Sequence, residues 1–356
     1  MSTDTAKKFV SFEALPDFLA QLAQGACVYA PRRENKAVVY RIWGPDEKVE
    51  FAARPTESCK HVIFPRSEAL FSFSRGGEGE NPDASALSLQ EAPEPGPAVI
   101  FGALSCDARG FLAFDPVYDG CGTGGRAKDV YYLKRRALTT LIVRTCKTPL
   151  NTCFCTWVGG GPASSEGADA LMTEIGKGWL FEAVSDKGAV LLQSLPDASG
   201  EQCAEGAASR EAAQGLFPRP ADLEAAPVSL RALFDSAAFW EKQTAQCLYC
   251  GACTYLCPTC YCFNITDESN GVKGLRMRSW DNCMSPLFTL ETSGHNPRPA
   301  KFNRLKNRVG HKFSYYPKIH SGRFSCCGCG RCIKSCPSSV DIRKIVLDAI
   351  KEAANV

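Results

Sequence analysis

The stretch CLYCGACTYLCP, from Cys247 to Pro258, decides the fold, and CCGCGRCIKSCP, from Cys326 to Pro337, repeats it. Both copies contain the spacing C-x2-C-x2-C-x3-C-P, which is typical of the chain around a cubane [4Fe–4S] cluster. Three closely spaced thiolates can reach three irons of one cube if the backbone between them turns, and the glycines between them favour such turns. The pattern therefore predicts two iron–sulfur clusters.

The fourth cysteine of each motif normally binds the neighbouring cluster. The predicted ligands are Cys247, Cys250, Cys253 and Cys336 for the first cluster, and Cys326, Cys329, Cys332 and Cys257 for the second. Two zinc ribbons are the alternative, but these need pairs of C-x2-C separated by a longer loop. Paired clusters of this kind transfer electrons, so we expect a relay and assign no catalytic residue.

Twelve further cysteines remain among the twenty of the chain. Four of them are predicted at or just beyond strand ends, where they could hold a third [4Fe–4S] cluster: Cys106, Cys146, Cys153 and Cys155. Small buried thiols that only pack in the core are the alternative, but in a strand C-x-C would point both side chains the same way, which favours binding of both to one cluster.

A trio, Cys260, Cys262 and Cys283, forms an incomplete cage of three thiols. It could gain a ligand from the other domain, but packing beside the clusters is the favoured interpretation.

The composition is that of an ordinary globular chain of 356 residues, apart from its cysteines. The start MSTDTAKKFV lacks the apolar segment of a signal peptide, and no run of about 18 apolar residues predicts a membrane span. We therefore expect a cytoplasmic protein with reduced thiols that serve metal, and no membrane partner.

Positive charge is concentrated towards the C-terminus. Residues 271–356 hold 16 Lys and Arg against 5 Asp and Glu, an excess of 11. Nucleic-acid binding is one explanation, but cations that stabilise anionic clusters are a stronger one, so no nucleic-acid partner is expected. A solvated or partner-facing basic surface is the default interpretation, and Arg331, Lys334 and Lys312 are candidates for raising cluster potentials.

The patterns predict an α/β N-terminal domain over residues 1–195, a linker over 196–228 that is helical in part, and an α-helical dicluster ferredoxin domain over 229–356. Short strands are expected at AVVYRIW and KHVIF, a surface loop at 76–97, and buried strands at 98–104 and 138–143. Helices are expected at LPDFLAQLA, after residue 107, over 229–245 and after Pro337.

Several long segments together resemble one family. They include TESCKHVIFPRSEALFSF, VIFGALSCDARGFLAFD, CKTPLNTCFCTWVGGGP, CPTCYCFNITDE, RMRSWDNCM and NPRPAKFNRLKNRVGHKFSYYP. From about Val28 to Ile345 the chain resembles the iron–sulfur subunit of anaerobic sulfite reductase, which typifies this family. The same family includes the beta subunit of sulfhydrogenases and the related subunit of flavin oxidoreductases coupled to heterodisulfide reductase.

The resemblance implies an electron-transfer subunit of a multi-subunit oxidoreductase. Its partners would be an FAD- and NAD(P)-binding flavoprotein subunit and a catalytic redox subunit. An enzyme subunit with a small-molecule redox site at Cys106 and Asp107 is an alternative, and an iron–sulfur redox sensor is another.

Overall fold

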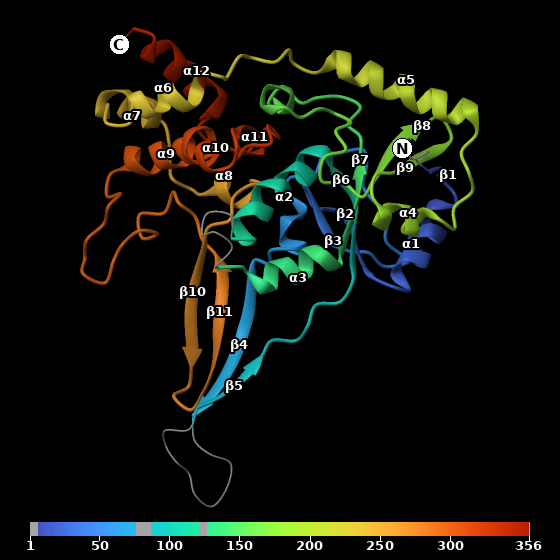
Figure 1. The fold of residues 1–356 in the computed structure, drawn as a ribbon, viewed down its shortest axis with the longest axis horizontal. Helices are drawn as coiled ribbons and strands as arrows, with labels where there is room; N and C mark the ends of the chain where they lie inside the picture. Colours follow the sequence, from blue (N-terminus) through green and yellow to red (C-terminus); the bar gives the residue numbers. More distant parts are fainter. Residues whose placement is uncertain (1–5, 76–86, 121–126, 356) are drawn as a thin grey trace, which may run out of the picture.

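The computed structural model describes residues 6–75, 87–120 and 127–355. Two β-sheets organise these residues, one of seven strands and one of four. Figure 1 shows the seven-stranded sheet within the body of the molecule and the four-stranded sheet projecting away from it. Helices from the last third of the chain gather beside the larger sheet, and the cysteine motifs lie among them.

The seven-stranded sheet has a parallel centre and antiparallel edges. β2 pairs in parallel with β6, β6 with β7, and β7 with β8. The strand order is β1-β9-β8-β7-β6-β2-β3. The bounds are β1 (Lys7–Ser11), β2 (Cys27–Glu34), β3 (Ala37–Ile42), β6 (Ala98–Leu104), β7 (Thr139–Arg144), β8 (Ala170–Ile175) and β9 (Gly178–Ala183). This mixed sheet confirms the predicted α/β character of the N-terminal part.

Helices cover this sheet on two sides. Alternate residues of β6 enter different cores: Phe101 packs with Phe18 of α1, and Ile100 packs with Phe111 of α2. A strand buried on both faces reads as a continuous apolar run, which is why AVIFGAL was predictable. The helices of this part are α1 (Leu15–Ala23), α2 (Ser105–Tyr118), α3 (Val130–Leu138), α4 (Asp186–Leu192) and α5 (Gly200–Leu216).

The projecting sheet joins two distant parts of the chain. Its order is β10-β11-β4-β5, with every pair antiparallel. Its strands are β4 (Ser67–Arg75), β5 (Leu87–Glu91), β10 (Phe263–Ser269) and β11 (Lys273–Trp280). The hairpin β10–β11 lies between the two cysteine motifs, so the expectation of an α-helical ferredoxin domain is not confirmed for this segment.

The remaining helices surround the cysteine motifs. Their shared core includes Trp240, Phe313 and Ile345. The bounds are α6 (Ala226–Ala232), α7 (Ala237–Thr244), α8 (Ala252–Tyr255), α9 (Lys301–Gly310), a π-helical turn η4 (His311–Tyr315), α10 (Tyr316–Ile319), α11 (Arg331–Lys334) and α12 (Ile342–Ala353). Asp341 caps α12 by accepting a hydrogen bond from the Arg343 backbone N–H, and the predicted helix after Pro337 therefore begins at Ile342.

Two predicted elements differ from the structure. KHVIF is not a strand, because Ser58 accepts a hydrogen bond from the Lys60 backbone N–H and starts the 3-10 helix η1 (Cys59–Val62). The single helix predicted over 229–245 is two helices, α6 and α7, since Ser236 caps a new helix by accepting from the Phe239 backbone N–H.

Two predicted connections contain regular structure. The loop predicted over 76–97 includes β5, while residues 76–86 lie outside the described part. Residues 200–216 of the stretch predicted as a linker form α5, which packs on strands β8 and β9: Arg210 pairs with Glu182, and Gly206 lies against Leu180. None of the described helices combines the length and hydrophobicity that crossing a membrane requires.

Candidate iron–sulfur sites

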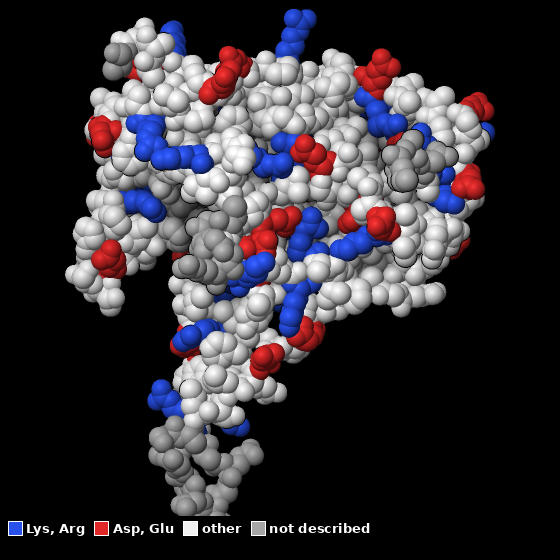
Figure 2. Space-filling view, viewed as in Figure 1, with Lys and Arg blue, Asp and Glu red and all other residues white. Residues whose placement is uncertain are grey.

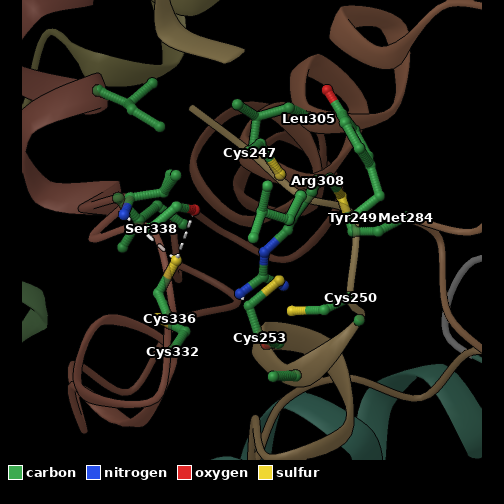
Figure 3. A pocket seen from close by; sticks show the side chains of 16 residues that line it. Cys247, Tyr249, Cys250, Cys253, Met284, Leu305, Arg308, Cys332, Cys336 and Ser338 are labelled. Carbon is green, nitrogen blue, oxygen red and sulfur yellow. Dashed lines mark hydrogen bonds between the residues drawn. The ribbon is translucent and has the colours of Figure 1, made fainter. Parts of the chain in front are cut away.

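The first motif borders a mainly apolar cavity, which we call the first cavity. Its walls include Cys247, Cys250 and Cys253 from the segment around α8, and Cys336 from the loop after α11. Figure 3 shows these four side chains around the cavity, together with Tyr249, Met284 and Leu305. The structure thus brings together all four cysteines predicted for the first cluster.

A second cavity adjoins the first. It is lined by Cys257, Cys326, Cys329 and Cys332, the four cysteines predicted for the second cluster. Phe154 and Ile342 add apolar wall, and Arg308 and Lys312 add positive charge. Cys332, Arg308 and Ile342 line both cavities, so the two sites share a wall.

The two motifs fold into matching turns. Gly251 precedes α8 and Gly330 precedes α11, and both glycines have a positive φ, of 75° and 73°. A single helical turn follows each glycine and carries the third cysteine of the motif. Gly328 adds a third positive φ, of 64°. These turns curl the backbone so that cysteines close in sequence can face one cavity.

We expect Gly330→Ala to destabilise the fold strongly. An added Cβ would lie 2.2 Å from the Thr152 carbonyl oxygen, and a positive φ is itself unfavourable for alanine. Gly322→Ala is the matched control, because Gly322 has a φ of +80° but no atom within 4 Å of an added Cβ. The control should lose about 1–2 kcal/mol of unfolding free energy, and Gly330→Ala about 1–3 kcal/mol more. Urea unfolding of both variants measures the difference, and equal losses would show that the close approach to Thr152 has no cost.

Hydrogen bonds distinguish the thiols within each set. Burial would raise the pKa of Cys336, but hydrogen bonds that include those from Ser338 and the Val340 backbone N–H lower it. A hydrogen bond from Cys327 lowers the pKa of Cys329 to about 7, whereas burial raises that of Cys326 to about 12. A hydrogen bond with Cys260 also lowers the pKa of Cys257, well below its usual range. Because metals bind the thiolate, this environment favours the metal-binding form of Cys257, Cys329 and Cys336.

The four cysteines predicted for a third cluster lie near the carboxyl ends of the parallel strands. Cys106 is in the first turn of α2, directly after β6, and Cys146 follows β7. Cys153 lies in a loop and Cys155 begins the 3-10 helix η3 (Cys155–Val158). This segment contacts the second motif, since the Phe154 N–H donates to the Gly328 carbonyl at 2.8 Å. The C-x-C segment is therefore not in a strand, contrary to the expectation behind it, and yet both thiols are buried.

Electrostatics link these four thiols to one another. Burial, together with the charges of Cys146 and Cys153, raises the pKa of Cys155 to about 12. Burial also raises the pKa of Cys146 and of Cys106. Arg54 donates to Cys153 Sγ at 3.0 Å, and no carboxylate of the described residues pairs with this guanidinium. The site thus has a half-buried cation, Arg54, positioned towards sulfur.

The trio of cysteines lies beside the first and second sets. Cys260 Sγ accepts from Arg308 Nη1 at 3.4 Å, and its thiol is hydrogen bonded to that of Cys257. Cys262 and Cys283 are hydrogen bonded to each other, which lowers the pKa of Cys262 and raises that of Cys283. The three cysteines of the trio therefore belong to two separate thiol pairs, Cys260 with Cys257 and Cys262 with Cys283.

Much of the positive charge in residues 271–356 points inward. Five cations of this region are buried: Arg278, Arg304, Arg308, Lys312 and Arg331. Figure 2 shows Lys and Arg interspersed with Asp and Glu over the visible face. The default interpretation of a solvated basic surface is therefore wrong for these five residues. Sequence reasoning also missed Lys60, which is buried with its Nζ 2.8 Å from the Cys260 carbonyl oxygen.

A buried ion pair ties the second motif to the α/β part. Both oxygens of Asp107 accept from Arg331, each at 2.8 Å, and the Asp107 side chain is 0% exposed. Arg331 also donates to the Pro55 carbonyl. Asp107 is therefore committed to this joint between α2 and α11, rather than free to meet a small substrate.

The donor sets fit [4Fe–4S] clusters. Each of the first two cavities is lined by its four predicted thiols and by one further cysteine, Cys332 in the first and Cys327 in the second, and its walls are otherwise mainly apolar. Within the described residues, no three histidine, cysteine or acidic side chains converge on the position of one metal ion. The thiols instead surround a cavity, and a four-iron cube uses sulfur ligands in that manner.

Comparison with known proteins agrees with this chemistry. Residues 246–340 match the 4Fe-4S dicluster domain family. The class is therefore that of iron–sulfur, electron-transfer subunits of oxidoreductases. The chain is 30% identical over 349 residues to sulfhydrogenase 2 subunit beta of Pyrococcus furiosus, covering 96% of this chain and 97% of that protein. The chain belongs to the iron–sulfur subunit family that contains this protein. No solved structure matches it.

Proposed function

We propose that this chain relays electrons between a nicotinamide-oxidising flavoprotein subunit and a catalytic redox subunit in one complex. The observation that carries the proposal is the shared wall of the first and second cavities, formed by Cys332, Arg308 and Ile342. Bound [4Fe–4S] clusters would each supply reversible one-electron transfer. Two such sites that share a wall allow electrons to pass through the protein.

The proposed ligands are the two crossed cysteine sets. Cys247, Cys250 and Cys253 hold one side of the first site and Cys336 the other, while Cys326, Cys329 and Cys332 face Cys257 across the second. The apolar side chains between them exclude water. Arg308 and Lys312 offset negative charge at sulfur, since buried anionic centres need nearby cations.

We also propose a third [4Fe–4S] site at Cys106, Cys146, Cys153 and Cys155. A further cavity beside the second one is lined by Cys329, Gly330, Cys106 and Arg54. Leu104, Cys106 and Cys327 pack together, with Cys146 and Cys329 against them. The half-buried Arg54, which has no carboxylate partner among the described residues, supports an anionic centre here.

Replacing Cys146 by alanine tests the third site. We expect the variant to lose iron and sulfide equivalent to one cluster per chain, because a ligand at the strand edge is gone. Cys203→Ala is the matched control, since Cys203 lies on α5 and lines none of the described cysteine cavities. Iron and acid-labile sulfide are measured after anaerobic purification, and an unchanged content in Cys146→Ala would contradict the assignment.

The relay itself is tested by anaerobic purification of the complex from its native cell. We expect a flavoprotein and a catalytic subunit to be recovered together with this chain. The relative belongs to a sulfhydrogenase by name, so a hydrogenase subunit is the first catalytic partner to look for. Reduced nicotinamide should reduce the clusters of this chain only when the flavoprotein is present. Equal reduction of the isolated chain would contradict the relay.

A further inference from the structure

A stripe of buried cations runs along one helical segment beside the two cavities. Arg304, Arg308 and Lys312 are spaced four residues apart on α9 and the π-helical turn that follows, and they are 5%, 4% and 2% exposed. Side chains four residues apart lie on the same face of a helix. The segment therefore directs three positive charges to one side.

The three cations contact neutral groups, not carboxylates. Arg304 donates to the Arg298 and Pro299 carbonyls, and Arg308 donates to the Cys253 carbonyl at 2.8 Å. Lys312 donates to Thr259 Oγ1 at 2.7 Å and to the Ser325 carbonyl at 3.0 Å. No ion pair to an acidic side chain of the described residues involves any of them.

Uncompensated buried charge is expensive, since removing an ion from water costs several kcal/mol even after relaxation. The negative groups that can offset this cost are the sulfurs. Charges of Cys253, Cys260, Cys332 and Cys257 act on Arg308, and those of Cys257, Cys260 and Cys326 act on Lys312. Arg308 and Lys312 therefore interact with cysteines that line the cluster sites.

Arg308 and Lys312 differ in which cavities they line. Arg308 lines both cavities, and Figure 3 shows it among the cysteines of the first. Lys312 lines the second cavity and is absent from the walls of the first. A fixed cation stabilises the reduced form of a nearby cluster more than the oxidised form, because reduction adds negative charge, and this raises the potential.

We propose that Arg308 sets the reduction potentials of both clusters together, while Lys312 sets that of the second cluster. Both residues act on the clusters through their positive charge, and neither is a cluster ligand. The inference rests on the proposed two-cluster relay. Its consequence is that Arg308 raises both potentials together, while Lys312 adds a further increase to that of the second cluster alone.

Redox titration followed by electron paramagnetic resonance tests this inference on the full chain, purified anaerobically. We expect Arg308→Gln to shift both cluster potentials to more negative values, and Arg308→Lys to restore most of each shift. Lys312→Gln should shift the second cluster alone. Lys318→Gln, an exposed cation on α10, is the control and should shift neither. The two signals are assigned by their separate loss in Cys250→Ala and Cys329→Ala.

The outcomes separate this inference from the proposed function. If the wild-type chain shows no pair of cluster signals, the relay fails before any variant is compared. If both signals are present but the potentials of a fully loaded Arg308→Gln are unchanged, the inference alone is overturned. Equal shifts in Arg308→Lys and Arg308→Gln would also overturn it, because the contact to Cys253 would then matter and not the charge. Should Arg308→Gln fail to load, Lys312→Gln decides, and a shift in both clusters or in neither overturns the inference.

Discussion

Replacing Cys250 by alanine is expected to remove the cluster of the first cavity and to leave that of the second. Cys329→Ala should have the opposite effect, because each cysteine lines one cavity and not the other among the described walls. A [4Fe–4S] cluster needs its full set of protein ligands for stable binding. Each variant should therefore lose about half of the visible absorbance that these two clusters contribute, and one of the two paramagnetic signals that they give after reduction.

The two variants control each other, since both remove a thiol from the same type of motif. Iron and acid-labile sulfide, measured per chain after anaerobic purification, report the loss directly. Cys203→Ala on α5 should retain the wild-type content. Spectra that match the wild type in both Cys250→Ala and Cys329→Ala would refute the ligand assignment. Loss of all clusters in either variant would show that the two sites load only together.

Asp107→Asn is expected to reduce the free energy of unfolding by about 3–5 kcal/mol, because it leaves the buried Arg331 with an uncompensated charge. The carboxylate accepts two hydrogen bonds from Arg331, and its side chain is 0% exposed. Asparagine keeps the shape but can no longer balance the guanidinium. The effect should also loosen the second cavity, because Arg331 belongs to the second cysteine motif.

Asp267→Asn is the matched control for this substitution. Asp267 also makes a two-bond contact, to Arg276, but both side chains are more than 40% exposed on the projecting sheet. Exposed pairs of this kind contribute about 0–1 kcal/mol. Urea unfolding under anaerobic conditions, followed by tryptophan fluorescence, compares the two. If both variants are as stable as the wild type, the buried pair does not hold α2 to α11 in the way we infer.

The cysteine motifs were the most informative part of the sequence. Ligand spacing is a local property, so C-x2-C-x2-C-x3-C-P could predict which thiols would meet even though 68 residues separate Cys257 from Cys326. The structure places those thiols around two cavities. Strand β6 and the helix that follows it were equally predictable, because a buried parallel strand leaves a continuous apolar run.

The errors arise where one side chain overrides a local pattern. KHVIF has the composition of a strand, but the hydrogen bond accepted by Ser58 starts a helical turn there. Residues 229–245 keep a helical apolar pattern across the break that Ser236 creates. The burial of Arg308 and Lys60 was not predictable from composition, since it depends on segments that meet only in the fold. The four-residue spacing of Arg304, Arg308 and Lys312 was the available signal.

The shared architecture of the two cavities also constrains how the protein matures. The first cavity takes walls from residues 247–253 and from 332–345, so it cannot close until the ribosome has synthesised the chain as far as Ile345. Domains that fold during synthesis normally complete their cores in order from the N-terminus. Here the cysteines of the first motif are synthesised before the segment with Cys336, which lies about 80 residues further along the chain and completes the first cavity. We therefore expect the first cluster to be inserted late, after the segment that contains Cys336 has been synthesised.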